Sequence, residues 1–162
     1  VAGREFIRAY EADPGNPQAA MKAAQTLFYF RGRPIDALAA LDDVQRHLPN
    51  FPRAYLLRSQ VLFSLGRMTE AGENITRELA LCSLPESFYH QSVLARFKGD
   101  STGERRALRR QLELSLKSGR RAFVDQALER WDALPAQGPD SADVAAIGAQ
   151  TRQHFGLSRT PR

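Results

Sequence analysis

The sequence predicts an all-α protein built from antiparallel helical hairpins that stack side by side. One pattern occurs twice, 34 residues apart, between residues 16 and 75, and a period of this length is typical of helical-hairpin repeats. Apolar residues in each copy follow a helical spacing, and Gly or Pro separates the runs. The matched positions are Asn16, Ala20, Leu27, Phe28, Tyr29, Gly32, Arg33, Ala37 and Leu41, which return as Asn50, Ala54, Val61, Leu62, Phe63, Gly66, Arg67, Ala71 and Ile75.

The composition is that of a globular domain. The chain has 162 residues, of which 43% are hydrophobic and 25% are charged, and this length suits one domain. No apolar run reaches the roughly 18 to 20 residues that cross a bilayer, so we expect no membrane insertion. Cys82 is the single cysteine, which excludes an internal disulfide and leaves the compartment open between cytoplasm and periplasm.

The first half of the chain reads as five helices. Asn16 is expected to cap the second of them and Asn50 the fourth, and glycines 32 and 66 end the same two helices. The apolar and proline positions of the first expected helix recur 35 residues later, in the second helix of the first complete hairpin. Residues 1–15 are therefore expected to be the second helix of a truncated upstream repeat. The chain would then be a fragment of a longer protein. The expected helices span residues 3–12, 17–30, 34–47, 51–65 and 69–81.

The second half continues with less regular spacing. The expected helices span residues 85–99, 102–118, 120–134 and 141–155. Residues 16–134 would form about three repeats, and residues 135–155 a connector and a capping helix, which the open end of a helical stack requires. Residues 156–162 are expected to be a disordered tail.

The repeated segment resembles the tetratricopeptide repeat family. The match rests on a glycine that ends the first helix, an alanine five residues later, a large apolar residue four further on, and a proline at the end. These residues are Gly32, Ala37, Leu41 and Pro49, then Gly66, Ala71 and Ile75, with Pro85 two places late. The second repeat departs from the family pattern at Arg58 and Glu78, where apolar or small residues are usual.

The resemblance implies a right-handed α-α superhelix whose concave face is lined by the first helix of each hairpin. It also implies that a protein or peptide partner binds in this groove. The mixture of aromatic rings and cations at groove positions would suit a ligand with acidic and apolar residues, although the aromatic rings could instead pack between helices. The groove positions are Lys22, Thr26, Tyr29, Arg53, Leu56, Gln60, Phe63, Tyr89, Val93 and Arg96.

A second candidate surface is basic. The formal charge is +5 and the pI is about 9.9, but residues 96–121 hold nine Lys or Arg against three Asp or Glu, a net +6, so the remainder carries −1. Four arginines follow a helical spacing there: Arg105, Arg106, Arg109 and Arg110. They could contact nucleic acid or an acidic polysaccharide, but a solvated helix face is the favoured interpretation.

No residue pattern predicts catalysis, a cofactor or a metal site. His47, His90 and His154 are far apart in sequence and have no ligand-spaced neighbours, and no phosphate loop or nucleophile motif is present. The sequence therefore favours a non-enzymatic scaffold for protein–protein interaction, from a bacterial source. In its parent protein it would accompany a glycosyltransferase or an envelope export or secretion system. The oligomeric state stays open.

Overall fold

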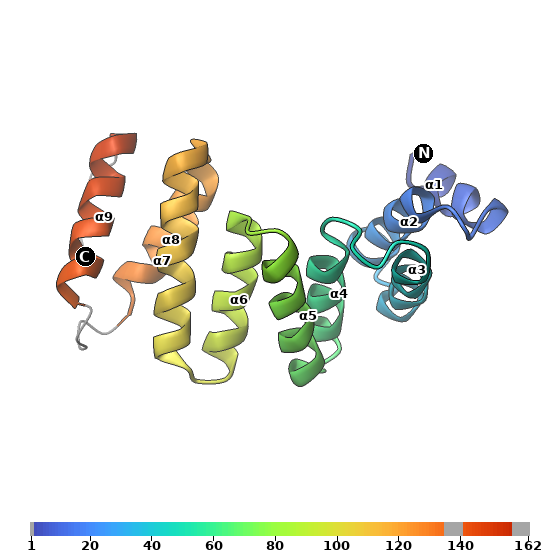
Figure 1. Ribbon diagram of the computed structural model, residues 1–162, viewed down its shortest axis with the longest axis horizontal. Coiled ribbons are helices and arrows are strands. Elements are labelled where there is room, and N and C mark those ends of the chain that lie inside the picture. The colour runs from blue at the N-terminus through green and yellow to red at the C-terminus, as the bar shows by residue number, and fades with distance from the viewer. Residues whose placement is uncertain (1, 135–140, 157–162) are drawn as a thin grey trace. The chain divides into compact units, whose positions relative to one another are not determined.

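The computed structural model describes residues 2–134 and 141–156, and all regular structure in these ranges is helical (Figure 1). This confirms the predicted all-α class. The helices form two compact units, residues 1–82 and 83–162. The first unit holds α1 (Ala2–Ala12), α2 (Pro17–Tyr29), α3 (Pro34–His47), α4 (Ala54–Ser64) and α5 (Met68–Leu81). The second holds α6 (Pro85–Phe97), α7 (Ser101–Ser118), α8 (Arg121–Asp132) and α9 (Ser141–Phe155).

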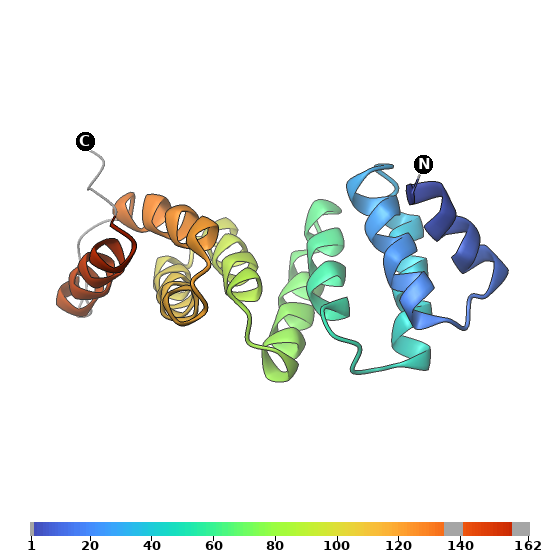
Figure 2. The same ribbon diagram turned by 90° about the horizontal axis from the view of Figure 1, so that it is seen from above.

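Antiparallel hairpins form from α2 and α3, from α4 and α5, and from α6 and α7 (Figures 1 and 2). Asn16 caps α2 as expected, because its side-chain oxygen accepts hydrogen bonds from the backbone N–H groups of Gln18 and Ala19 at 3.0 and 3.1 Å. Gly32 and Gly66 follow α2 and α4 with φ of +61° and +74°. Their left-handed backbone, which glycine adopts without a steric cost, lets the chain turn into the next helix.

Small residues bring the helices of the first unit close together. The alanines at the α2–α3 contact are fully buried, and Leu41 and Val44 fill the space beside them. In the next hairpin the Ser59 hydroxyl donates to the carbonyl oxygen of Ala71 at 2.7 Å, so α4 and α5 are joined by a buried hydrogen bond. The buried alanines are Ala20, Ala23, Ala24, Ala37 and Ala40.

The start of α4 corrects one expectation. Asn50 does not cap this helix, which begins at Ala54 with Arg53 at the N-cap and without a side-chain cap from Arg53. Pro52 gives the physical reason: the residue before a proline is biased away from helical backbone angles, so Phe51 is disfavoured as a first helical residue. Arg53 itself has φ of 66°, in the left-handed region.

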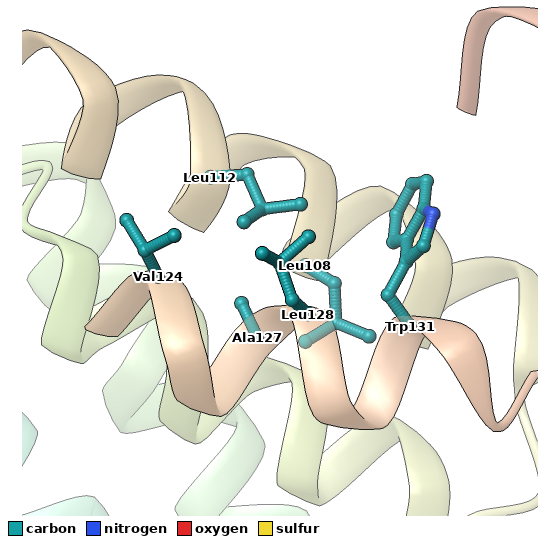
Figure 3. Packing of buried hydrophobic residues seen from close by; sticks show 6 residues of the cluster. All are labelled: Leu108, Leu112, Val124, Ala127, Leu128 and Trp131. Carbon is teal, nitrogen blue, oxygen red and sulfur yellow. The ribbon is translucent and has the colours of Figure 1, made fainter. Parts of the chain in front are cut away.

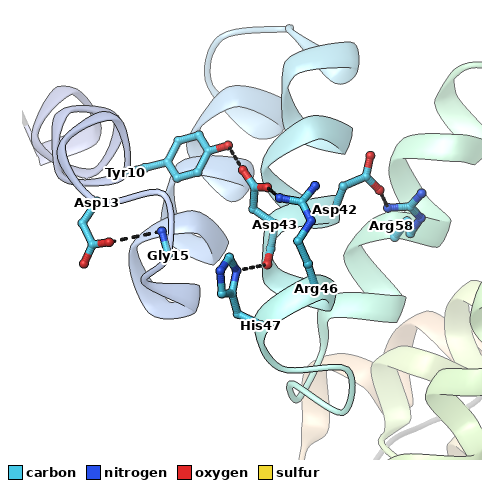
Figure 4. A network of polar contacts seen from close by, with 8 residues as sticks. All are labelled: Tyr10, Asp13, Gly15, Asp42, Asp43, Arg46, His47 and Arg58. Carbon is cyan, nitrogen blue, oxygen red and sulfur yellow. Dashed lines mark hydrogen bonds and ion pairs between the residues drawn. The ribbon is translucent and has the colours of Figure 1, made fainter.

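Polar contacts tie α3 to its neighbours on both sides (Figure 4). The Tyr10 hydroxyl of α1 donates to the Asp43 carboxylate at 2.5 Å, and Arg46 pairs with the same carboxylate. Partial burial and the bond to Asp43 raise the pKa of Tyr10 to about 12. Arg58 of α4 pairs with Asp42, which explains how a cation is accommodated where the family has an apolar or small residue.

The second unit has its own apolar core between α7 and α8, made of Leu108, Leu112, Val124, Ala127, Leu128 and Trp131 (Figure 3). The buried carboxylate of Glu104 on α7 forms a two-pronged ion pair with Arg130 on α8, at 2.5 and 3.0 Å. Arg152 of α9 binds both carboxylate oxygens of Asp132 at 2.6 Å. The predicted helix at residues 141–155 is therefore present and fastened to α8.

The predicted connector at residues 135–140 and, apart from Gly156, the predicted tail at 156–162 lie outside the described residues. Among the residues that are described, none belongs to a helix long and apolar enough to cross a membrane.

Candidate partner-binding face

The candidate site of the first unit is the exposed surface shared by α2 and α4, which contact each other. We call it the α2–α4 face. Lys22, Tyr29 and Arg53 are exposed on it, and Gln60 and Phe63 are half-buried. Five of the predicted contact residues are thus accessible on two adjacent helices.

Tyr29 is an exposed aromatic side chain of this face, with 55% of its surface accessible. Its hydroxyl donates to the side-chain oxygen of Gln60 at 2.5 Å, so the ring is oriented by a bond from α2 to α4. Burial raises the pKa of Tyr29, and the charge of Arg53 opposes that rise. Tyr29 and Arg53 thus place an exposed aromatic ring and an exposed cation on the same face.

Two predicted contacts lie inside the helix packing instead. Thr26 is only 5% exposed, and its hydroxyl donates to the carbonyl oxygen of Lys22 at 2.9 Å. Gly3 of α1 covers it so closely that a Cβ there would meet the Thr26 methyl group at 2.8 Å. Leu56, 6% exposed, belongs to the core. Neither side chain offers surface to a ligand.

Glu78 of α5 is 1% exposed and lies beneath the start of α4. Its Oε2 accepts a hydrogen bond from the backbone N–H of Leu56 at 3.2 Å. Burial raises the pKa of this carboxyl, and three influences oppose the rise: the Leu56 N–H, the charge of Arg53 and the Arg53 N–H. In the sequence, Glu78 stands out only as a departure from the family pattern, and that departure was the available signal of its role.

The remaining predicted contacts belong to the second unit. On α6, Tyr89 and Val93 are half-buried and Arg96 is exposed, with its guanidinium 5.8 Å from the centre of the Phe97 ring. Phe97 itself is an exposed aromatic side chain. This unit therefore presents a separate aromatic and cationic pair.

The basic patch lies on α7 and is partly neutralised. Glu113 pairs with both Arg109 and Arg110, at 3.1 and 2.7 Å. The Arg110 guanidinium also lies 5.9 Å from the centre of the Phe88 ring of α6. Arg106 is exposed and Arg105 is half-buried. Arg109 and Arg110 of this patch are thus engaged within the protein.

Within residues 2–134 and 141–156, no three or more His, Cys, Asp or Glu side chains are grouped so that they could hold an ion. Cys82 is free and half-buried.

Comparison with known proteins places the fold. No protein-family model matches the sequence, and no curated protein matches it significantly. Solved structures do match. A crystal structure of MamA has a TM-score of 0.70 and 17% identity, covering 99% of this chain and 87% of that one. The crystal structure of YrrB, described as a TPR protein with an unusual peptide-binding site, has a TM-score of 0.61 and 18% identity. The match covers 93% of this chain and 84% of YrrB. TTC0263, a thermophilic TPR protein of Thermus thermophilus, has a TM-score of 0.62 and 18% identity. The match covers 94% of this chain and 89% of TTC0263.

The chain has a tetratricopeptide-like repeat fold. In this fold α2 and α4 are the first helices of successive hairpins, and α3 and α5 are the second helices. The family residues of the sequence match occupy the expected places: Ala37, Ala71 and Leu41 are fully buried, and Ile75 is 3% exposed. Glu78 is 1% exposed at a position where the resemblance to the tetratricopeptide family predicts an apolar or small residue.

Proposed function

We propose that the chain is a protein-interaction module without enzymatic activity, and that its α2–α4 face binds an extended partner segment carrying carboxylates and apolar side chains. The observation that carries the proposal is the exposed Tyr29 ring, oriented by its hydrogen bond to Gln60, on the same face as the exposed Arg53. A half-exposed aromatic ring held in one orientation loses little conformational freedom on binding. Aromatic residues and arginines are the groups that most often dominate interface energy.

Charge gives the face its selectivity. Lys22 and Tyr29 are seven residues apart on α2 and so lie on the same side of the helix. With Arg53, the face carries two exposed cations and one exposed aromatic ring. An acidic segment would be steered by these cations, and its apolar side chains would cover Tyr29 and Phe63. The peptide-binding site named for YrrB, a protein of the same fold, supports peptide recognition as the function. A role beside a glycosyltransferase or an export system stays a prediction.

The test is direct binding of a defined probe. A fluorescein-labelled peptide of alternating Glu and Leu, with one central Phe, is titrated with the whole chain. Tyr29→Ala and Arg53→Gln should each weaken binding about tenfold. Arg8→Gln is the matched control, because Arg8 is an exposed cation of α1 outside this face. Equal affinity of all four proteins would remove the α2–α4 face from consideration.

The α7 arginines support a second candidate, binding of an anionic polymer. The four arginines with Glu113 carry a net charge of 4 − 1 = +3. Affinity for a single-stranded oligonucleotide should then fall steeply between about 50 and 200 mM salt. Reversal of charge at Arg105 and Arg106 should abolish it. A salt-independent affinity, or one that survives this reversal, would refute polymer binding by α7.

A further inference from the structure

The first turn of α4 is satisfied by a residue from another helix. A helix start leaves backbone N–H groups without helical partners, and a capping box satisfies those of the N-cap and N3 residues by local side chains. At α4 these residues are Arg53 and Leu56, and Arg53 provides no side-chain cap. Glu78 of α5 interacts with both N–H groups through its buried carboxyl.

Burying the Glu78 carboxyl costs desolvation free energy, and the repeat fold does not need a carboxyl at this position. The Glu78 side chain is 1% exposed, and its Oε1 has no hydrogen-bond partner among the described residues. An apolar or small residue, which the family resemblance predicts at this position, would avoid the desolvation of a carboxylate. A costly buried group of this kind is better explained by what it holds in place than by stability.

The residue that the buried Glu78 carboxyl holds in place is Arg53. Its φ of 66° makes it the single non-glycine residue with positive φ in the described part of the chain, and such a φ is unfavourable for a residue with a Cβ. This conformation persists only where the surroundings enforce it. The N–H and the positive charge of Arg53 both oppose the rise in the pKa of Glu78, and the same charge opposes the rise in the pKa of Tyr29.

We propose that Glu78 is a positioning residue for the α2–α4 face: from α5 it caps the first turn of α4 and holds Arg53 in the left-handed conformation that presents its cation on the same face as Tyr29. The effect on a ligand rests on the function proposed above. The effect on Arg53 and α4 does not, so the two can fail separately.

A ligand-free measurement tests the positioning itself. NMR of the labelled chain should show the strong intraresidue HN–Hα contact of positive φ at Arg53, and it should be lost in Glu78→Ala. Hydrogen exchange at the Leu56 amide should accelerate about tenfold in that variant. Glu78→Gln keeps a carbonyl acceptor and should retain both signals. Glu73→Ala, an exposed glutamate of the same helix, is the matched control. Unchanged Arg53 and Leu56 signals in Glu78→Ala would overturn the proposal.

A binding cycle then tests whether Glu78 acts through Arg53. With the Glu and Leu peptide, Glu78→Ala should weaken binding about fivefold in the wild-type background and not at all in the Arg53→Gln background. An equal loss in both backgrounds would mean that Glu78 acts elsewhere, and would overturn its assigned role. If the wild-type chain does not bind the peptide, the proposed function fails, and the NMR signals still decide whether Glu78 positions Arg53.

Discussion

The first helices of the two regular hairpins, α2 and α4, occupy equivalent places but begin in different ways. Asn16 and Asn50 are 34 residues apart and identical, yet only Asn16 caps its helix. The two asparagines differ in where the next proline lies. Pro17 directly follows Asn16 and takes the first helical position, where its missing N–H costs nothing. Pro52 follows Asn50 by two residues, and α4 begins beyond it at Ala54. The same residue in two repeats therefore does not ensure the same contact.

The consequence is that α2 is capped locally and α4 is capped from α5. A local cap depends on one side chain next to the helix. The cap of α4 depends on a buried carboxylate that is distant in sequence, so the fold of the second hairpin and the position of Arg53 are linked. Four comparisons separate the two kinds of cap, beginning with the largest expected effect.

Glu78→Lys should destabilise the first unit by about 3–5 kcal/mol, because it buries an unpaired cation against the N–H groups of a helix start. Thermal or urea unfolding followed by circular dichroism measures the loss. Glu73→Lys, exposed on the same helix, should change stability by less than about 0.5 kcal/mol. Similar losses for the two variants would argue against a buried cap.

The asparagines give the cleanest contrast. Asn16→Ala removes the acceptor of the Gln18 and Ala19 amides, so it should cost about 1 kcal/mol. Asn50→Ala should cost less than about 0.5 kcal/mol, as expected for an exposed residue outside a cap. The two urea midpoints, measured with equal m-values, decide the comparison. A loss at Asn50 as large as at Asn16 would show that both helices are capped locally.

The pH dependence of stability should report Glu78. Its pKa is raised in the folded chain, so the native state binds the proton more tightly than the unfolded state does. The stability that this group contributes is then fully present below its ordinary pKa of 4.5 and is lost as pH rises from there through the raised pKa. Glu78→Gln should lack this component. The slopes of the two unfolding curves between about pH 4 and 7 provide the measurement, and identical slopes would contradict the shift.

Arg53→Gly should have the smallest effect and the opposite sign. Glycine adopts positive φ without a steric penalty, so the change should raise stability by roughly 0.5 kcal/mol, part of the gain being lost to the more flexible unfolded chain. Binding of the acidic peptide should weaken because the cation is gone. A destabilised variant would mean that the Arg53 side chain supports the fold.

Much of the architecture could be predicted because the determining signals are local. Asn16, Gly66 and the buried alanines act within a helix or its next turn, and the helical period exposes them. The cap of α4 could not be predicted, since it joins residues 22 positions apart in sequence. At the site, the family resemblance predicted Tyr29, Arg53 and Gln60 as contact residues, and all three are accessible. Thr26 was misplaced because its burial depends on α1, whose close approach at Gly3 is a tertiary feature.

The most direct measurement for the proposed function is a titration of the isotope-labelled chain with the Glu and Leu peptide, followed by NMR. Chemical-shift changes should concentrate on α2 and α4, with Lys22, Tyr29 and Gln60 among the largest, and Arg53→Gln should remove most of them. Changes confined to the arginines of α7, or no changes at concentrations up to about 1 mM, which corresponds to a binding free energy near −4 kcal/mol, would contradict the assignment of the α2–α4 face.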